Sequence, residues 1–128
     1  MRRTIDIEGA LVAALKERGT SASAPPVPSR IGSSLPHVHV TRTGGDEVSI
    51  VQDRHRVDMD VYAATSAAAM DAACELTGWL RSLVGSTLGG VPVYDARVDT
   101  LPYDNPDPLH PTLPRATFKA SLVTRVQH

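Results

Sequence analysis

The sequence predicts an α+β domain with the element order α-β-β-α-β-β, in which two helices pack on one face of a four-stranded, mainly antiparallel sheet. Three observations lead to this prediction: two stretches with apolar residues at helical spacing, one long stretch of polar and apolar alternation, and two proline-rich segments between elements. The chain has 128 residues, the usual size of one domain, so we expect a single domain over residues 1–128.

The two predicted helices cover residues 5–18 and 67–84. The first begins with acidic residues, ends with basic residues and is followed by Gly19, an arrangement that suits the helix dipole. Its apolar face is formed by Ile7, Leu11, Ala14 and Leu15. The second helix follows a capping Thr65 or Ser66 and precedes Gly85. Its apolar stripe is rich in alanine, which favours close packing on a sheet, and contains Ala69, Ala73, Leu76, Leu80 and Leu83.

Four strands are predicted, at residues 37–43, 47–63, 91–101 and 116–126, with a turn at residues 44–46 between the first two. The second strand has the clearest pattern, because polar and apolar residues alternate along it, as is typical of a strand with one buried face. A hairpin of this length seldom stays regular, so a bulge is expected within residues 49–53. The face of the second strand turned away from the core is predicted to contain Arg54, Arg56, Asp58, Asp60 and Tyr62.

Residues 20–36 and 102–114 are predicted to be connecting loops, because they contain four and five prolines respectively. Proline has no backbone N–H to donate, which excludes helix interiors and central strands. It also lowers the entropy that is lost when a loop is held in one shape. We therefore expect the second loop to be an interface arm that contacts a partner.

The composition narrows the class of protein. Hydrophobic residues make up 41% of the chain but aromatic residues only 4%, so the core has few large side chains and support from neighbouring subunits is expected. The formal net charge of −1 argues against sequence-specific nucleic-acid binding. No apolar stretch approaches the roughly 20 residues that span a bilayer. The start Met1-Arg2-Arg3 is not followed by the apolar segment of a signal peptide.

The sequence contains one weak candidate for a metal site. His37 and His39 share a face of one predicted strand and Asp58 lies on the next, so a metal-dependent hydrolase could use all three. Metal sites need three or four converging ligands, and histidines at strand edges are usually solvated, so no metal is expected. Both Gly-Gly pairs precede strands, where they cannot form a phosphate-binding loop at a helix start. We expect a protein that has no cofactor and is not an enzyme.

Three segments have a more specific pattern: residues 38–45 (VHVTRTGG), residues 56–63 (RVDMDVYA) and, above all, residues 101–108 (LPYDNPDP), which PRATF follows at residues 114–118. Together they resemble the tail terminator (tail completion) proteins of long-tailed, siphovirus-type bacteriophages of actinobacteria. The resemblance extends over most of the chain, from the first helix to the last strand.

This resemblance implies a structural virion protein, an α+β subunit that assembles into a homo-oligomeric, hexameric ring. Such a ring caps the tail tube, ends its polymerisation and provides the surface that joins the head, and genome DNA can pass through it. The implied partners are further copies of the chain, the tail tube protein and a head–tail connector or stopper protein. The implied location is the virion, in the tail at the neck, and the host cytoplasm during assembly. The candidate interface residues are Arg42, Asp46, Tyr103, Asn105, Asp107, His110 and Arg115.

Two more hypotheses stay open beside the metal-dependent hydrolase. One is a head-to-tail connector or stopper protein of the phage neck, which belongs to the same structural class. The other is a small adaptor of a bacterial host that binds a peptide through residues 20–36.

Overall fold

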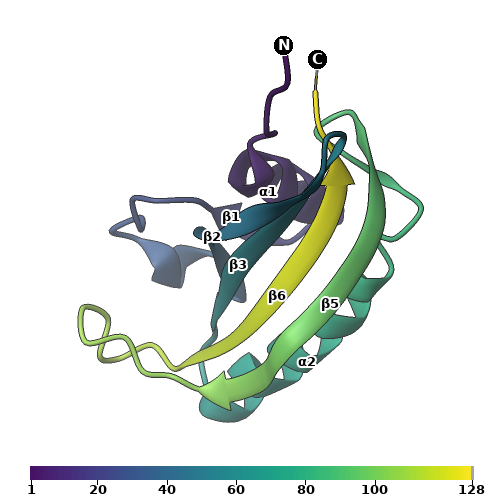
Figure 1. Cartoon of the computed structure of the whole chain (residues 1–128). Helices are drawn as coiled ribbons and strands as arrows, with labels where there is room; N and C mark the ends of the chain where they lie inside the picture. The colour runs from purple at the N-terminus through teal and green to yellow at the C-terminus, as the bar shows by residue number, and fades with distance from the viewer. Residues whose placement is uncertain (128) are drawn as a thin grey trace.

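A computed structural model describes residues 1–127 of the chain (Figure 1). It contains two α-helices, α1 (Ile7–Glu17) and α2 (Ser66–Arg81), and one short 3-10 helix, η1 (Ile31–Ser33). Six strands form one sheet in the order β1-β2-β3-β6-β5-β4. The strands are β1 (Ser21–Ser23), β2 (His37–Ser49), β3 (Gln52–Tyr62), β4 (Thr87–Leu88), β5 (Val91–Asp104) and β6 (Arg115–Arg125).

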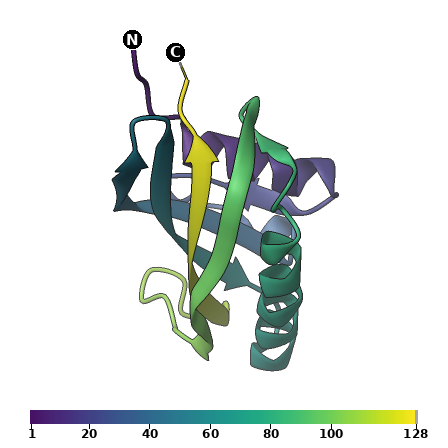
Figure 2. The same ribbon diagram turned by 45° about the vertical axis from the view of Figure 1, so that its right-hand side comes forward.

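The predicted four-stranded sheet with both helices on one face was wrong. The sheet has six strands, it is mixed because β1 pairs with β2 in parallel, and it is curled (Figures 1 and 2). The two additional strands are three and two residues long, and so short a segment has no periodic pattern that a sequence could reveal. The two helices, β5 and β6 begin and end within three residues of the predicted positions, whereas β2 ends six residues later and β3 begins five residues later than predicted.

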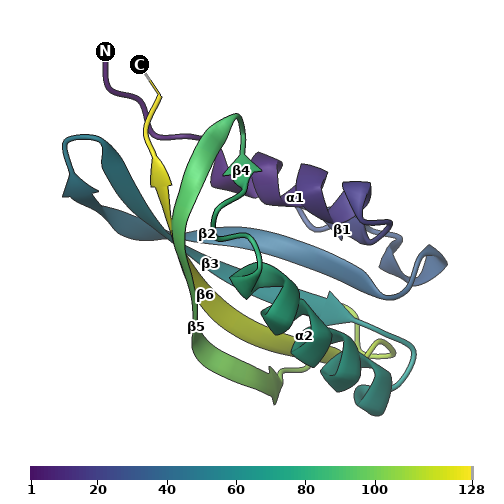
Figure 3. The same cartoon turned by 90° about the vertical axis from the view of Figure 1, so that its right-hand side faces the viewer.

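The curl brings the two edges of the sheet toward one helix. α1 packs against β1 and β2 at one edge and against β4 at the other, whereas α2 packs along β5, β6 and β3 (Figure 3). Register shifts occur in the β2–β3 pair and three times in the β5–β6 pair. Each such irregularity bends a strand and increases its twist, which accounts for the curl.

The core lies between the curled sheet and the two helices. α1 contributes Ile7, Leu11 and Leu15, all without solvent exposure, and Phe118 of the central strand β6 is equally buried. Both helices begin at capping side chains, since Asp6 accepts a hydrogen bond from the Gly9 N–H and Thr65 accepts one from the Ala68 N–H. The core therefore consists of small and aliphatic side chains around a single phenylalanine.

The turn predicted at residues 44–46 was wrong, because Gly44 and Gly45 lie inside β2. Their φ angles are 116° and 147°, and a Cβ on Gly45 would lie 2.0 Å from the Arg54 carbonyl oxygen. Gly45 is required by this close approach of two strands and Gly44 by its positive φ angle, so the pair marks an irregularity in the strand and not its end. The chain turns later, at Ile50 and Val51, and the second register shift lies between Glu47 and Ser49, just before the predicted bulge.

The two proline-rich segments also differ from the prediction. Residues 20–36 include β1 and η1, and Pro102 lies inside β5. Proline is tolerated there because β4 pairs only with Val91 and Pro92, which leaves the rest of β5 at the edge of the sheet. The second loop is therefore residues 105–114. Both segments lie at the same end of the sheet, where Gly32 and Leu113 are neighbours (Figure 1).

Candidate interaction surface

The loop of residues 105–114, called the anchored loop below, folds back over the face of the sheet that points away from the core. Tyr62, at the end of β3, lies on this face and has no solvent exposure. The Tyr62 hydroxyl donates a hydrogen bond of 2.7 Å to Asp107. The His110 ring meets the Tyr62 ring edge-on at 5.8 Å, and the Arg115 guanidinium lies 5.7 Å from its centre. Tyr62 is thus the residue on which the loop is anchored.

Asp107 is the centre of this contact. Its carboxylate accepts hydrogen bonds from the Tyr62 hydroxyl, from the Leu109 N–H and from His110 Nδ1. Burial raises the pKa of Asp107, but these hydrogen bonds and the nearby Arg115 outweigh it and lower the pKa to about 2. Burial and the hydrogen bond to Asp107 raise the pKa of Tyr62 to about 12. Tyr62 is therefore a neutral donor to an ionised acceptor.

The two ends of the anchored loop are tied to each other. Arg115 Nε donates to the Asn105 carbonyl oxygen at 2.6 Å, and the Asn105 N–H donates to the Arg115 carbonyl oxygen at 2.9 Å. The Asn105 amide donates to Thr117, whose hydroxyl in turn donates to Asp60. The loop is therefore held at its stem as well as at Asp107.

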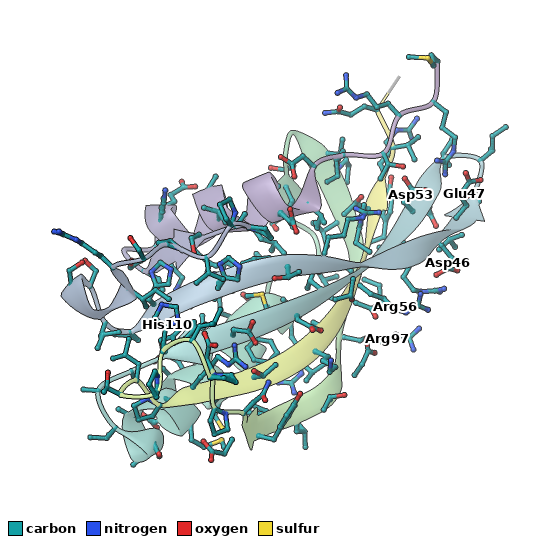
Figure 4. All side chains as sticks on the ribbon, turned by 90° about the vertical axis from the view of Figure 1, so that its left-hand side faces the viewer. Asp46, Glu47, Asp53, Arg56, Arg97 and His110 are labelled. Atoms are coloured by element: carbon teal, nitrogen blue, oxygen red, sulfur yellow. The ribbon has the colours of Figure 1, made fainter. Side chains whose placement is uncertain are left out.

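The structure places the seven predicted interface residues in two groups. Asn105, Asp107, His110 and Arg115 belong to the anchored loop and its stem, where they hold the loop in place, while Tyr103 is partly exposed on β5. Arg42 lies in the middle of β2, opposite Val57 of β3, and Asp46 lies on β2 toward the opposite end of the sheet (Figure 4). The seven residues therefore do not form one surface.

Two exposed apolar residues of this region were not among the seven candidate interface residues. Leu109 at the top of the anchored loop is 83% exposed, and Leu101 of β5 is 68% exposed. Tyr62 was also missed, although an aromatic residue among the charged positions of one strand face is a usable signal. An aromatic ring on such a face is stabilised when another segment shields it from water, and the proline-rich loop does this for Tyr62.

Arg42 supports a buried histidine. Its guanidinium donates to His55 Nδ1 at 2.9 Å, so His55 Nε2 carries the proton and donates to the Thr124 hydroxyl at 2.9 Å. Burial, with the Arg42 charge beside it, lowers the pKa of His55 to about 4. The Arg42 N–H also donates to the carboxylate of Glu8 in α1. Arg42 therefore joins α1 to the β2–β3 pair.

His37 and His39 were expected to be solvated, and this was wrong, since they are 6% and 3% exposed. Their partners are serines of β1: Ser21 lies 2.7 Å from His37 Nδ1, and Ser23 lies 2.8 Å from both His37 Nε2 and His39 Nδ1. Burial lowers the pKa of both histidines. These serine–histidine hydrogen bonds lie beside the parallel backbone pairing of β1 with β2.

The structure does not bring Asp58 to these histidines. Asp58 forms an ion pair with Lys119 at 3.3 Å, on the open part of the same face. Among residues 1–127, no group of three or more His, Cys, Asp or Glu side chains is placed to hold a metal ion.

The open part of this face is a shallow hollow of about 430 Å³ with charged walls of both signs. The charges are largely paired within the chain, for example Arg97 with Asp95 at 3.0 Å and Arg54 with Asp46 at 2.8 Å. The charged residues around the hollow are Arg54, Arg56, Asp58, Asp95, Arg97, Asp99 and Lys119. Paired surface charges of this kind orient a partner more than they add affinity.

In the part of the chain that the structure describes, neither helix has the length and apolar character needed to cross a membrane. A comparison of the chain with protein-family models and with curated proteins found no match.

Proposed function

We propose that this chain is a tail terminator subunit of a long-tailed bacteriophage, which assembles into a hexameric ring at the end of the tail tube. The ring stops polymerisation by geometry: one face fits the end of the tube, and the other face does not repeat the binding surface of the tube. A closed ring needs an interface in which two different surfaces of the chain meet, with a rotation that closes.

One observation carries the proposal. The segment with the strongest resemblance, residues 101–108 followed by 114–118, coincides with the last part of β5, the anchored loop and the start of β6. The hydrogen bond between Tyr62 and Asp107 holds this loop on the sheet, while Leu109 of the loop and Leu101 of β5 remain exposed. A loop that is fixed by its own subunit and carries exposed apolar side chains loses little entropy when it meets a partner.

The function is tested with the tail tube protein encoded in the same genome. Purified chain carrying an affinity tag is mixed with assembled tubes and detected by gold labelling in negative-stain microscopy. We expect label at one end of each tube and hexameric rings at that end. Label along the tube walls, or tubes that keep growing after addition of the chain, would contradict the proposal. Binding to a portal-proximal protein without binding to the tube would identify the chain as a neck connector or stopper.

The role of the anchored loop needs a variant that leaves the fold intact. Deleting residues 105–112 would uncover Tyr62, so a point substitution is better. Leu109→Asp changes only an exposed side chain, and Val84→Asp, at another exposed apolar position, is the control. We expect Leu109→Asp to abolish either ring formation or binding to the head-side protein, while Val84→Asp retains both. If Leu109→Asp also retains both, the loop is not an interface.

A further inference from the structure

The tip of the β2–β3 hairpin is an exposed apolar projection that the chain holds in one shape. The hairpin arm, defined as residues 44–54, projects at one end of the sheet (Figure 3), where Gln52, Asp53 and Arg54 still pair with the end of β6. Val48 and Ile50 at its tip are 42% and 81% exposed. The Arg2 guanidinium donates to the carbonyl oxygens of Ser49 at 3.0 Å and Ile50 at 3.1 Å. A tip that is already held in one shape loses little conformational entropy when it docks, which favours a role as an interaction surface.

The border of this tip is basic. Arg125 lies opposite Gln52 in the β3–β6 pair, and Arg3 pairs with Gln127 just beyond it. Within residues 1–127, neither guanidinium forms an ion pair, whereas the acidic side chains of the arm are already occupied by arginines. Figure 4 shows these acidic residues, Asp46, Glu47 and Asp53, gathered on the arm. The positive charges of Arg3 and Arg125 are therefore available to a partner.

The opposite end of the molecule has a groove of matching character, called the α2 groove. It has a volume of about 340 Å³ and an apolar floor formed by Leu35, Pro36, Ala63, Ala64, Ala68 and Ala72. Asp71 and Glu75 of α2 line it as well. Glu75 pairs with Arg18 at 2.7 Å, whereas Asp71 has no ion-pair partner among the described residues. The groove is thus apolar with an acidic rim.

Tip and groove cannot meet within one chain. The tip adjoins the start of β3 and the groove begins at Ala63, just after its end. The 11 residues of β3 separate them by about 35 Å. A contact between these two different surfaces therefore joins two copies head to tail, and repetition of such a contact gives a closed ring or a filament.

We propose that the hairpin tip of one copy docks into the α2 groove of the next copy. Val48 and Ile50 enter the apolar floor, while Arg3 and Arg125 face Asp71 and Glu75. The inference rests on the proposed ring and names the surfaces that close it.

Oxidative cross-linking in a Cys74→Ser background tests the contact, since Cys74 is exposed. One chain carries Ile50→Cys and a second carries Ala68→Cys, and the two are mixed at the highest soluble concentration. We expect a disulfide-linked pair that contains one copy of each. The chain with native Cys74, which is exposed on α2 outside the groove, is the matched control and is expected to link poorly to Ile50→Cys.

A second groove, of about 630 Å³ between α1 and β4, is the competing site for the tip. It contains Ala13, so Ala13→Cys replaces Ala68→Cys in a parallel mixture. Preferred linkage of Ile50→Cys to Ala13→Cys, to another Ile50→Cys, or to nothing would overturn the inference.

Charge reversal provides an independent measurement. Asp71→Arg and Arg125→Asp are each expected to weaken self-association about tenfold in sedimentation experiments, and the double variant is expected to recover it. Double-variant association no better than that of either single variant contradicts the pairing. Rings that bind the tube but show no tip-to-groove linkage would overturn this inference and leave the proposed function intact. Tip-to-groove linkage in a protein that does not bind the tube would support this inference and contradict the proposed function.

Discussion

At the level of single residues, Tyr62 and Asp107 hold the anchored loop on the sheet at the end of β3. Tyr62 lies on the polar face of β3, where an uncovered aromatic ring would contact water. The anchored loop covers the ring, and Asp107 accepts a hydrogen bond from the Tyr62 hydroxyl together with two further hydrogen bonds. A buried carboxylate is stable only when its oxygens are satisfied in this way. The loop and the tyrosine therefore stabilise each other.

Replacing Asp107 with alanine should release the loop. We expect Asp107→Ala to cost about 2 kcal/mol in the free energy of unfolding, because hydrogen bonds to a charged group are lost and the Tyr62 hydroxyl stays buried without its acceptor. Urea denaturation measures the cost, and hydrogen exchange should show loss of protection at the Leu109 and His110 amides. Asp104→Ala, at an exposed site on the same segment, is the control. Equal stability of the two variants would rule out the anchoring role.

His55 makes stability depend on pH. Its pKa lies at about 4 in the folded chain and at 6.5 for an ordinary histidine, so the unfolded chain binds more protons between these values. The contribution of His55 is full above pH 6.5 and is lost as the pH falls through 4. Over that range we expect a loss of about 3 kcal/mol, measured as the free energy of unfolding at several pH values. His37 and His39, whose pKa values are also lowered by burial, act in the same direction.

The substitution His55→Gln distinguishes the contribution of His55 to the pH dependence from the contributions of His37 and His39. In His55→Gln, the side-chain oxygen can accept from Arg42 and the amide can donate to Thr124, as the neutral ring does. The variant should therefore be folded at pH 7 and should lose most of the His55 share of the pH dependence. An unchanged pH profile would show that His55 is not the titrating group.

At the level of elements, the β2–β3 hairpin is held by a segment far from it in sequence. Its turn, Ile50 and Val51, contains no glycine, proline or asparagine, the residues that usually form tight turns. Arg2 supplies the missing constraint through the Ser49, Ile50 and Gln52 carbonyl oxygens and through Asp53, which it meets at 2.6 Å. The hairpin is therefore ordered by the N-terminal segment.

Removing Arg2 should loosen this hairpin. Burial raises the pKa of Asp53, but hydrogen bonds from Arg2 and Thr4 lower it below its usual value overall. In Arg2→Ala we expect the pKa of Asp53 to rise in an NMR titration and the amides of Ile50 and Val51 to exchange faster. Stability should fall in urea denaturation, because a buried carboxylate loses its charged partner. Arg3→Ala is the control, and an equal effect on Asp53 in both variants would contradict the clamp.

At the level of the whole molecule, a core of small side chains depends on its one phenylalanine. Phe118 lies in the first half of β6, where it is fully buried, and β6 has a neighbouring strand on each side. Large side chains contribute most of the apolar area buried in a core, and alanine and valine replace that area poorly.

Phe118→Ala should therefore be severe. We expect a loss of about 3–5 kcal/mol, a large part of the stability of a domain of this size, measured by urea denaturation. Leu109→Ala, at an exposed position, should change stability by less than about 0.5 kcal/mol. If both variants are equally stable, the core is not centred on Phe118.

The sequence by itself determined the order of the two helices and four long strands, most of their bounds apart from the end of β2 and the start of β3, and which side of β3 faces the core. These properties follow from periodicity and capping within one segment. Leu11 belongs to the apolar face of α1, Met59 to the buried face of β3, and Thr65 caps α2. Only the tertiary structure decided the six-stranded curled sheet, the use of Gly44 and Gly45 inside a strand, the burial of His37 and His39, and the anchoring of the loop on Tyr62. The physical reason is that each of these depends on partners distant in the chain: Ser21 for His37, Arg54 for Gly45, and Asp107 for Tyr62.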